Sequence, residues 1–246
     1  MRILKGIIAQ LSFFSIVPSG QTDFQLVIDY SYLSPIVVGA VMGALDYIVV
    51  FLTHFVLENF SYLLLIPFVE IMRGFNHLDG LLDFGDALMI RGSPKDRLRA
   101  LKDVSVGAGG FGLAIVYLTI FYISTRLLTG YSLTLLYYLV SAEVVSRAIG
   151  LSVLSTLKPM DGSQLGKMFH EKLRNKLPVI LLQVVPFISL SVAVLFIVLA
   201  LIFSSLGKKI LGGSSGDLIG ATISLSFPLL LIGDVKCYPF CLPHFF

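Results

Sequence analysis

The chain has 246 residues, of which 56% are hydrophobic and only 13% are charged, and its mean hydropathy is +0.91. An average soluble domain carries about 25% charged residues, so this composition excludes an ordinary soluble globular protein and, more firmly, a disordered one. The net charge of +3 is too small to indicate a nucleic-acid partner. The composition therefore predicts an all-α, multi-pass membrane protein with a single domain over residues 1–246.

The apolar segments predict the membrane helices in chain order. Residues 1–18 carry Arg2 and Lys5 before an apolar stretch without a cleavage site, which indicates a first membrane-associated helix rather than a signal peptide. A bilayer core needs about 20 apolar residues per helix. Six further candidates are 33–57, 62–72, 111–128, 133–157, 177–206 and 218–232. We expect about six to seven membrane helices on this basis, in a helical bundle in the cell membrane.

Three polar loops separate these segments and hold the candidate active site. They cover residues 73–112, 158–176 and 207–221. The first two are rich in Lys and Arg and are joined by two spans, so the positive-inside rule places both in the cytoplasm. The apolar segment before the third loop, residues 177–206, is long for one membrane span and short for two. We favour a break at Pro186 that forms a helical hairpin and returns the third loop to the cytoplasmic side.

The most informative stretch contains Asp79, Asp83 and Asp86, which are spaced by four and then three residues. On a helix these carboxylates share one face, where they repel unless a cation neutralises them. Carboxylates near membrane depth are costly and usually functional, and Mg²⁺ prefers a few carboxylates together with waters and substrate phosphates. We predict a Mg²⁺ site on this face. A solvated helix surface and a cation or proton pathway are the alternatives.

Two polar residues precede the acidic face. His77 is a candidate general acid or base, or a hydrogen-bond donor to phosphate. Asn76 beside it is a candidate substrate-binding residue. Together with the three aspartates they favour a functional site over a plain surface.

Two glycine-rich segments each lead into a predicted membrane helix. Glycines let the backbone approach a phosphate closely, and helix N-terminal amides favour anions. The first segment supplies the candidate substrate-binding residues Lys102, Asp103, Ser105, Gly107 and Gly110. The second segment contains Asp217, which is either the N-cap of the last helix or a fourth site carboxylate. A flexible hinge with small residues for helix packing is the alternative for the glycines.

Arg147 lies inside an apolar span, four residues after Glu143. A buried cation needs a partner, so this arginine either forms an intrahelical ion pair or binds a substrate phosphate. Cys237 and Cys241 are too few for a disulfide scaffold or a closed zinc site, and we expect both thiols to be inert.

Several of these segments resemble the cobalamin synthase family, the adenosylcobinamide-GDP ribazoletransferases. His77-Leu-Asp-Gly-Leu-Leu-Asp-Phe-Gly-Asp86 is similar to the family's H-L-D-G-L-x-D-x-x-D. Segment 102–112 resembles K-D-S-x-x-G-x-x-G with one residue inserted, and Ser146-Arg147 resembles a G-R pair. Segments 158–166 and 212–221 resemble R-P-x-G-L-G and G-G-x-T-G-D-x-x-G-A. The similarities run in order over most of the chain.

This resemblance implies a Mg²⁺-dependent transferase that acts at a membrane, late in cobalamin (vitamin B12) biosynthesis. It would join adenosylcobinamide-GDP to alpha-ribazole, or to alpha-ribazole 5′-phosphate, and give adenosylcobalamin, or its 5′-phosphate, and GMP. Phosphoryl transfer relies on cations that hold phosphate oxygens more than on a covalent nucleophile. We therefore expect the three aspartates to hold Mg²⁺, and Lys102 and Arg147 to bind phosphate oxygens. His77 or one of the aspartates would take the proton from the attacking 5′-hydroxyl.

Two other classes remain open. A CDP-alcohol phosphotransferase also places an Asp-rich helix face at a membrane border, but its D-G-x-x-A-R motif would need Ala where Asp83 stands. A cation- or proton-coupled transporter would use the same carboxylates, and it predicts paired half-repeats, which do not stand out here. The sequence leaves open the oligomeric state, the choice of nucleoside or nucleotide acceptor, and the lower-ligand base.

Overall fold

The structure, a computed structural model, describes residues 2–17, 20, 23–103 and 105–241, with all of their side chains except those of Pro94 and residues 237–241. Cys237 and Cys241, which we expect to be inert, therefore lie outside the described side chains. Within the described ranges every named element is a helix, and one isolated bridge joins Pro159 to Ser214. The predicted all-α fold is confirmed.

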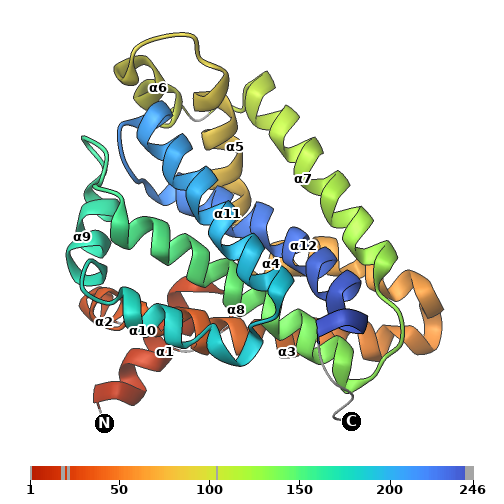
Figure 1. Cartoon of the computed structure of the whole chain (residues 1–246). Coiled ribbons are helices and arrows are strands. Elements are labelled where there is room, and N and C mark those ends of the chain that lie inside the picture. Colours follow the sequence, from red (N-terminus) through yellow and green to blue (C-terminus); the bar gives the residue numbers. More distant parts are fainter. Residues whose placement is uncertain (1, 18–19, 21–22, 104, 242–246) are drawn as a thin grey trace.

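Figure 1 shows the elements, which follow one another along the chain. They are α1 (Arg2–Phe14), α2 (Phe24–Asp29), η1 (Ser31–Leu33), α3 (Ser34–Leu57), η2 (Glu58–Leu64), α4 (Leu65–Met72), α5 (Asn76–Met89), α6 (Pro94–Ala100), α7 (Ala108–Leu127), α8 (Leu133–Thr156), α9 (Gln164–Leu173), α10 (Leu177–Leu182), η3 (Val185–Phe187), α11 (Leu190–Leu206), η4 (Gly207–Leu211) and α12 (Gly216–Cys241).

Five segments of the described chain are long and apolar enough to cross a membrane. They are Ser31–Met72, Ala108–Leu127, Leu133–Thr156, Leu190–Leu211 and Gly216–Lys236. This number is below the six to seven that we expected, for two reasons. The predicted helices 33–57 and 62–72 fall within one continuous segment, and Leu177–Phe187 is a shorter apolar helix.

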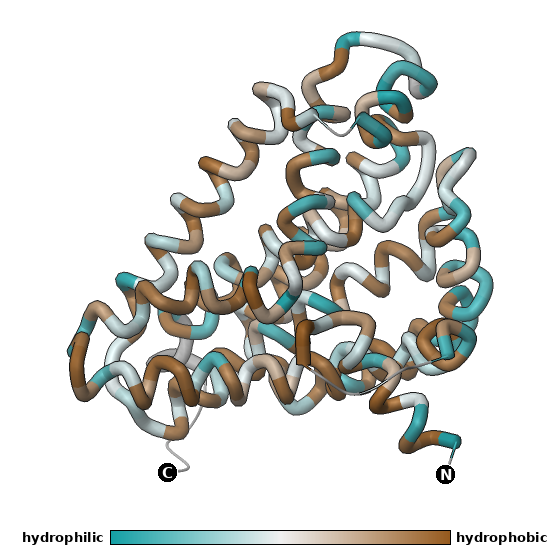
Figure 2. The backbone as a smooth tube through the Cα atoms, turned by 180° about the vertical axis from the view of Figure 1, so that it is seen from behind, coloured by the Kyte–Doolittle hydropathy of each residue, from teal (hydrophilic) through white to brown (hydrophobic). Residues whose placement is uncertain are grey.

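Helix α8 forms the centre of the bundle, and its neighbours form the outside. In its most apolar window 89% of the residues are buried, against 22% in the segment that contains α11. Large apolar side chains are exposed on the outer helices, with Phe55 at 73% and Leu201 at 66%, and Figure 2 shows apolar residues along them. Water-soluble surfaces rarely expose apolar patches of this extent, so these faces are suited to lipid.

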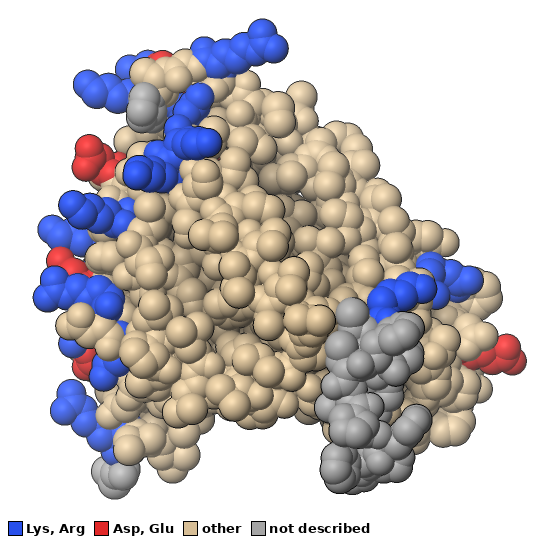
Figure 3. Space-filling view, in the orientation of Figure 1, with Lys and Arg blue, Asp and Glu red and all other residues tan. Residues whose placement is uncertain are grey.

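The polar loops meet at one end of the bundle. The amide of Ser214 donates to the carbonyl of Lys158 over 2.8 Å, which joins the third loop to the second. The guanidinium of Arg97 donates to the carbonyl of Ile210 over 3.1 Å, which joins the first loop to the third. Figure 3 shows Lys and Arg gathered along this edge. The prediction that the three loops share one side is therefore confirmed.

The predicted break at Pro186 explains how the third loop reaches that side. Between α10 and α11 the chain forms the short helix η3, which contains this proline, and α11 begins three residues after η3. A proline cannot donate the amide hydrogen bond that a continuous helix needs. The run therefore divides into a short helix and a longer helix that returns to the polar end.

Candidate active site

Helix α5 starts after a tight reversal of the chain and is amphipathic. Phe75 adopts a left-handed conformation with φ 59°, and its amide donates to the carbonyl of Glu70 over 2.9 Å. One face of the helix is buried through Leu81, Phe84 and Ala87, each at most 1% exposed. This packing holds the helix so that its acidic face points away from the core.

The acidic face of α5 consists of Asp79, Asp83 and Asp86, as their spacing predicts. Asp79 is exposed, and Asp83 and Asp86 are half-buried. Helix α12 brings a fourth carboxylate: a Cβ atom added to Gly80 would lie only 2.9 Å from the Cα atom of Asp217. A glycine at this crossing lets the two helices approach closely enough to place Asp217 beside the acidic face.

The N-cap of α12 comes from the neighbouring serine rather than from Asp217. The hydroxyl of Ser215 accepts a hydrogen bond from the amide of Leu218 over 3.1 Å. Of the two roles that the sequence left open for Asp217, the structure therefore disfavours the cap. Its carboxylate lies near Asp79 and Asp83 instead.

The electrostatics of the acidic face are unfavourable without a cation. Burial, followed by repulsion from Asp79, Asp217 and Asp86, raises the pKa of Asp83 to about 6. Among the described residues no three His, Cys, Asp or Glu side chains lie close enough to form a metal site alone. A cation held here would need additional oxygen ligands, which is how Mg²⁺ binds when waters and substrate phosphates complete its shell.

Asp86 has a structural role that the sequence did not indicate. Its carboxylate accepts hydrogen bonds from the amides of Gly107, over 2.7 Å, and Gly110, over 2.8 Å. These amides are at the start of α7, where anions are favoured. A Cβ atom on Gly110 would lie 2.6 Å from the carbonyl oxygen of Leu82. The glycines therefore permit close contact between α5 and α7, and their predicted contact with substrate stays a prediction.

The other residues of the first glycine-rich segment lie in an exposed loop. The carboxylate of Asp103 accepts from the amide of Ser105 over 3.0 Å, and this hydrogen bond lowers the pKa of Asp103. The ammonium of Lys102 lies 3.9 Å from where a Cβ atom on Gly162 would be. In the described chain no hydrogen bond or ion pair joins these three side chains to the acidic face.

A pocket of about 320 Å³ lies beside the acidic face, between α1, α5, α8, α9 and α12. It brings together four of the predicted site residues, Asn76, His77, Arg147 and Asp217. Arg73 also lines it. The pocket thus has a polar wall next to the carboxylates, and its other walls are apolar.

The imidazole of His77 is buried in the wall of this pocket at 8% exposure. Burial, together with the charges of Arg73 and Arg147, holds the pKa of His77 well below its usual value. The ring is therefore neutral near pH 7, and its Nδ1 atom has no hydrogen-bond partner. A neutral imidazole with a free ring nitrogen next to a polar pocket can accept a hydrogen bond from a bound hydroxyl.

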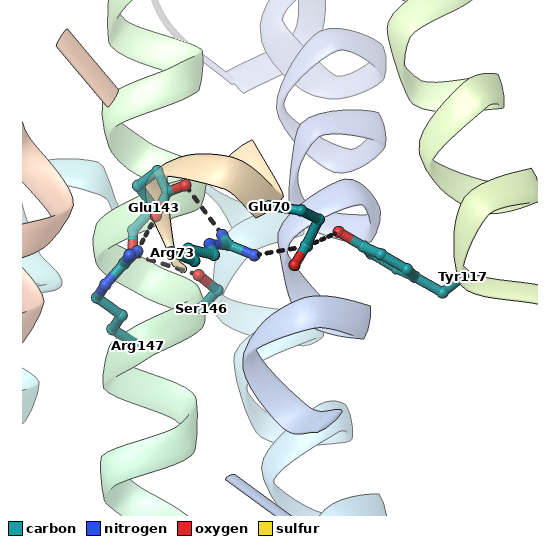
Figure 4. Close-up of polar contacts among 6 residues, drawn as sticks. All are labelled: Glu70, Arg73, Tyr117, Glu143, Ser146 and Arg147. Carbon is teal, nitrogen blue, oxygen red and sulfur yellow. Dashed lines mark hydrogen bonds and ion pairs between the residues drawn. The ribbon is translucent and has the colours of Figure 1, made fainter. Parts of the chain in front are cut away.

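A buried ion network lies behind the polar wall (Figure 4). Arg147 forms an ion pair with Glu143 on the same helix, which confirms one of the two predictions for this residue. The same carboxylate accepts from the guanidinium of Arg73 over 2.9 Å. Arg73 also lies 3.6 Å from Glu70, which accepts from the hydroxyl of Tyr117.

The sequence analysis did not identify Glu70 and Arg73. The available signal was their spacing of three residues at the end of an apolar segment, the same kind of pattern that Glu143 and Arg147 show. All four charged side chains are at most 4% exposed. Even so, the Nε and Nη2 atoms of Arg147 and the Nε and Nη1 atoms of Arg73 have no hydrogen-bond partner.

Comparison with known proteins gives a family match over most of the chain. The family described as cobalamin-5-phosphate synthase matches residues 6–234. A protein of Saccharolobus islandicus strain M.14.25 named adenosylcobinamide-GDP ribazoletransferase is 45% identical over 98% of this chain and 99% of its own length. Proteins with the same name from Sulfolobus acidocaldarius and Pyrobaculum islandicum are 43% and 34% identical, over 96% and 94% of this chain and 94% of each relative. No solved structure matches the chain.

Proposed function

The chain belongs to the family described as cobalamin-5-phosphate synthase, and on this basis we propose that it joins adenosylcobinamide-GDP to alpha-ribazole or to alpha-ribazole 5′-phosphate. The protein is a transferase of a late step in cobalamin synthesis. The family match thus favours the first of the three classes that the sequence left open.

The reaction is a phosphoryl transfer whose atoms balance without a further reagent. A ribose hydroxyl of the acceptor attacks the phosphorus on the corrinoid side of the pyrophosphate. A new P–O bond forms, the P–O bond to GMP breaks, and GMP leaves with that electron pair. When the acceptor carries a 5′-phosphate and the product retains it, the attacking oxygen is a ribose hydroxyl other than the 5′ one.

The acidic face carries this proposal, because its carboxylates fit a divalent cation. The pKa of about 6 for Asp83 reflects burial and crowding by other carboxylates, a situation that a bound cation relieves. Asp79, Asp83 and Asp86 would hold Mg²⁺ only together with waters and substrate phosphate oxygens, because these carboxylates do not lie close enough to form a site alone. Asp217 lies beside them. When bound, Mg²⁺ would neutralise charge on the pyrophosphate oxygens. Asp86 would bind the cation while its carboxylate also accepts the hydrogen bonds that fix the start of α7.

The polar wall of the pocket would supply the remaining groups. His77 is neutral and its Nδ1 atom has no hydrogen-bond partner, so it would accept a hydrogen bond from the attacking hydroxyl. The proton of that hydroxyl would go to His77 or to one of the aspartates, of which Asp83 has a pKa raised to about 6. Asn76 and Arg147 line the same pocket and would orient the substrates. Lys102, Asp103 and Ser105 would contact substrate only from the loop side, where the first and second loops lie near each other.

The basic loops also bear on orientation in the membrane. The three loops lie at one end of the bundle together with most of the Lys and Arg side chains that Figure 3 shows. By the positive-inside rule this end would face the cytoplasm, where nucleotide substrates are available. The active site would therefore be cytoplasmic, at the border of the cell membrane.

The test is a turnover assay on membranes that contain the protein. Adenosylcobinamide-GDP, alpha-ribazole and Mg²⁺ are mixed, and GMP and the cobalamin product are followed. We expect Mg²⁺-dependent formation of both products, with loss in Asp79→Asn and retention in Glu58→Gln, whose exposed carboxylate follows α3 and lies outside the pocket. Folded wild-type protein that forms neither product, with alpha-ribazole or with its 5′-phosphate, would contradict the proposal.

A further inference from the structure

The pocket has two chemically different walls, and this difference indicates what it binds. One wall is aromatic: Phe13 and Phe14 on α1 meet Phe169 on α9, with ring centroids 6.2 and 6.4 Å from that of Phe169. The other wall contains the guanidinium groups of Arg73 and Arg147. A ligand that fills the pocket would therefore combine a flat apolar group with an anion.

The arginine wall is a built site rather than a surface feature. Arg73 and Arg147 are 1% and 3% exposed. The Nε and Nη2 atoms of Arg147 and the Nε atom of Arg73 have no hydrogen-bond partner, whereas the Nη1 atom of Arg73 lies 3.6 Å from Glu70. A guanidinium carries five N–H donors, and buried donors left unpaired are costly. Glu143 takes up only part of this capacity, through one nitrogen of Arg147 and one of Arg73. Glu70 and the ring of Phe227 also contact Arg73, so the free pair of donors is that of Arg147, and two adjacent guanidinium nitrogens suit a phosphate.

Nearby carboxylates reduce the positive charge of this wall, and Asp217 on α12 lines the same pocket. Glu70 and Glu143 offset the two arginines, and the buried carboxyl of Asp46 lies close enough to both arginines to interact with them. The network is thus not strongly cationic by itself. Its affinity for an anion would come from directed N–H donors in a buried setting rather than from excess charge.

The volume limits which part of the substrates this pocket can hold. Ligand pockets are typically about 300–1,000 Å³, and this pocket, at about 320 Å³, is at the lower end. The pocket is too small for a corrinoid but is of suitable size for a nucleoside monophosphate with a planar base, which the acceptor and the GMP part of the donor both are. The pocket also borders the acidic face through Asp217 and His77, which is where the acceptor hydroxyl must react.

We infer that this pocket is the acceptor site, and that Arg147, with Arg73 behind it, binds a phosphomonoester on the acceptor while Phe14 and Phe169 hold its planar base. The inference rests on the proposed function and adds a phosphate subsite separate from the acidic face. It assigns the preference for a phosphorylated acceptor to Arg147. The unphosphorylated nucleoside would bind through the aromatic wall alone.

The first experiment compares two acceptors in steady-state kinetics with purified protein at saturating adenosylcobinamide-GDP. Charged hydrogen bonds contribute about 1.5–3 kcal/mol, so Arg147→Gln should lower kcat/KM for alpha-ribazole 5′-phosphate by about 10–100-fold, mainly through KM. The value for alpha-ribazole, which has no phosphate, should fall much less. Arg174→Gln, which removes an exposed guanidinium after α9, should change neither. An equal loss with both acceptors would overturn the inference.

A second experiment uses wild-type protein, because Arg147→Gln also removes a partner of Glu143 and can fail to fold. Ribose 5-phosphate should inhibit competitively against the acceptor and not against the donor, and ribose should not inhibit at the same concentration. If ribose 5-phosphate inhibits no better than ribose, or competes with the donor, the phosphate subsite is refuted. Absence of product with either acceptor would instead count against the proposed function itself.

Discussion

The acidic face of α5 and the ion network behind it both concentrate charged side chains. They differ in whether those charges have partners of opposite charge. In the network each carboxylate has a guanidinium or hydroxyl partner, and the side chains are almost fully buried. On the acidic face the carboxylates have one another as neighbours, and burial with this crowding raises the pKa of Asp83 to about 6. Buried charges in a membrane bundle must be paired within the protein. The crowded carboxylates at the polar end are the ones free to bind a cation.

The largest expected effect tests the paired region. Glu143→Gln leaves two buried arginines without their shared carboxylate, and loss of one partner from a buried ion pair costs about 3–5 kcal/mol. We expect a large fall in the midpoint of thermal unfolding in detergent. Glu171→Gln, which changes an exposed carboxylate on α9, serves as the control. An unchanged midpoint in Glu143→Gln would mean that the network does not stabilise the bundle.

A second change tests the crossing that brings Asp217 to the acidic face. In Gly80→Ala the new Cβ atom would lie 2.9 Å from the Cα atom of Asp217, and such overpacking costs about 1–3 kcal/mol. We expect lower stability together with lower turnover, because the carboxylates move apart. In the matched variant Gly112→Ala the new atom meets nothing within 4 Å. That variant should be neutral or slightly more stable, and a similar loss in both would argue against a close crossing.

Asp86 shares a feature with each region. It is on the acidic face, but its carboxylate has hydrogen-bond partners, as the carboxylates of the ion network do. Asp86→Ala removes a carboxylate that accepts from Gly107 and Gly110, and loss of a helix cap costs about 0.5–2 kcal/mol. We expect this loss in thermal unfolding, whereas Asp79→Asn should lose turnover with little change in stability. If the stability of Asp86→Ala matches wild type, the capping role is wrong.

The smallest effect comes from an exposed pair that contrasts with the buried network. Lys172 on α9 donates to Asp29 over 2.7 Å, with the lysine side chain 51% exposed. Such pairs contribute about 0.2–1 kcal/mol, so Lys172→Met should lower the unfolding midpoint only slightly. The hydrogen bond from Lys172 lowers the pKa of Asp29 below 3.8. The stabilisation by this ion pair is therefore fully present above pH 3.8, and it disappears as the pH falls through the lowered pKa of Asp29. A difference in unfolding midpoint between wild type and Lys172→Met that persists below that pKa would contradict this prediction.

Much of the fold could be predicted because membrane helices follow from local composition. The acidic face was predictable because four- and three-residue spacing fixes one helix face once α5 is helical. The position of the third loop was predictable because Pro186 interrupts a run too long for one span. The count of spans was less secure, since apolar composition alone does not separate a short helix such as α10 from a spanning one.

The partners of the charged residues could not be predicted, because they come from helices distant in sequence. Glu143 pairs with Arg73, which is 70 positions earlier, and spacing indicates only partners on the same helix. For the same reason the sequence predicted that Gly107 and Gly110 bind substrate phosphate. In the structure their amides donate hydrogen bonds to the carboxylate of Asp86. The aromatic wall could not be predicted either, because Phe14 is in the first apolar stretch and Phe169 in the second polar loop, and only the fold brings α1 and α9 together.

The most direct test of the account is the Mg²⁺ dependence of turnover in wild type, Asp83→Asn and Glu58→Gln. If the crowded carboxylates of the acidic face hold the metal, Asp83→Asn should need far more Mg²⁺ for half-maximal release of GMP. Glu58→Gln should follow the wild-type curve. The same half-maximal Mg²⁺ concentration in all three proteins, at comparable turnover, would contradict the assignment of the metal site to the acidic face.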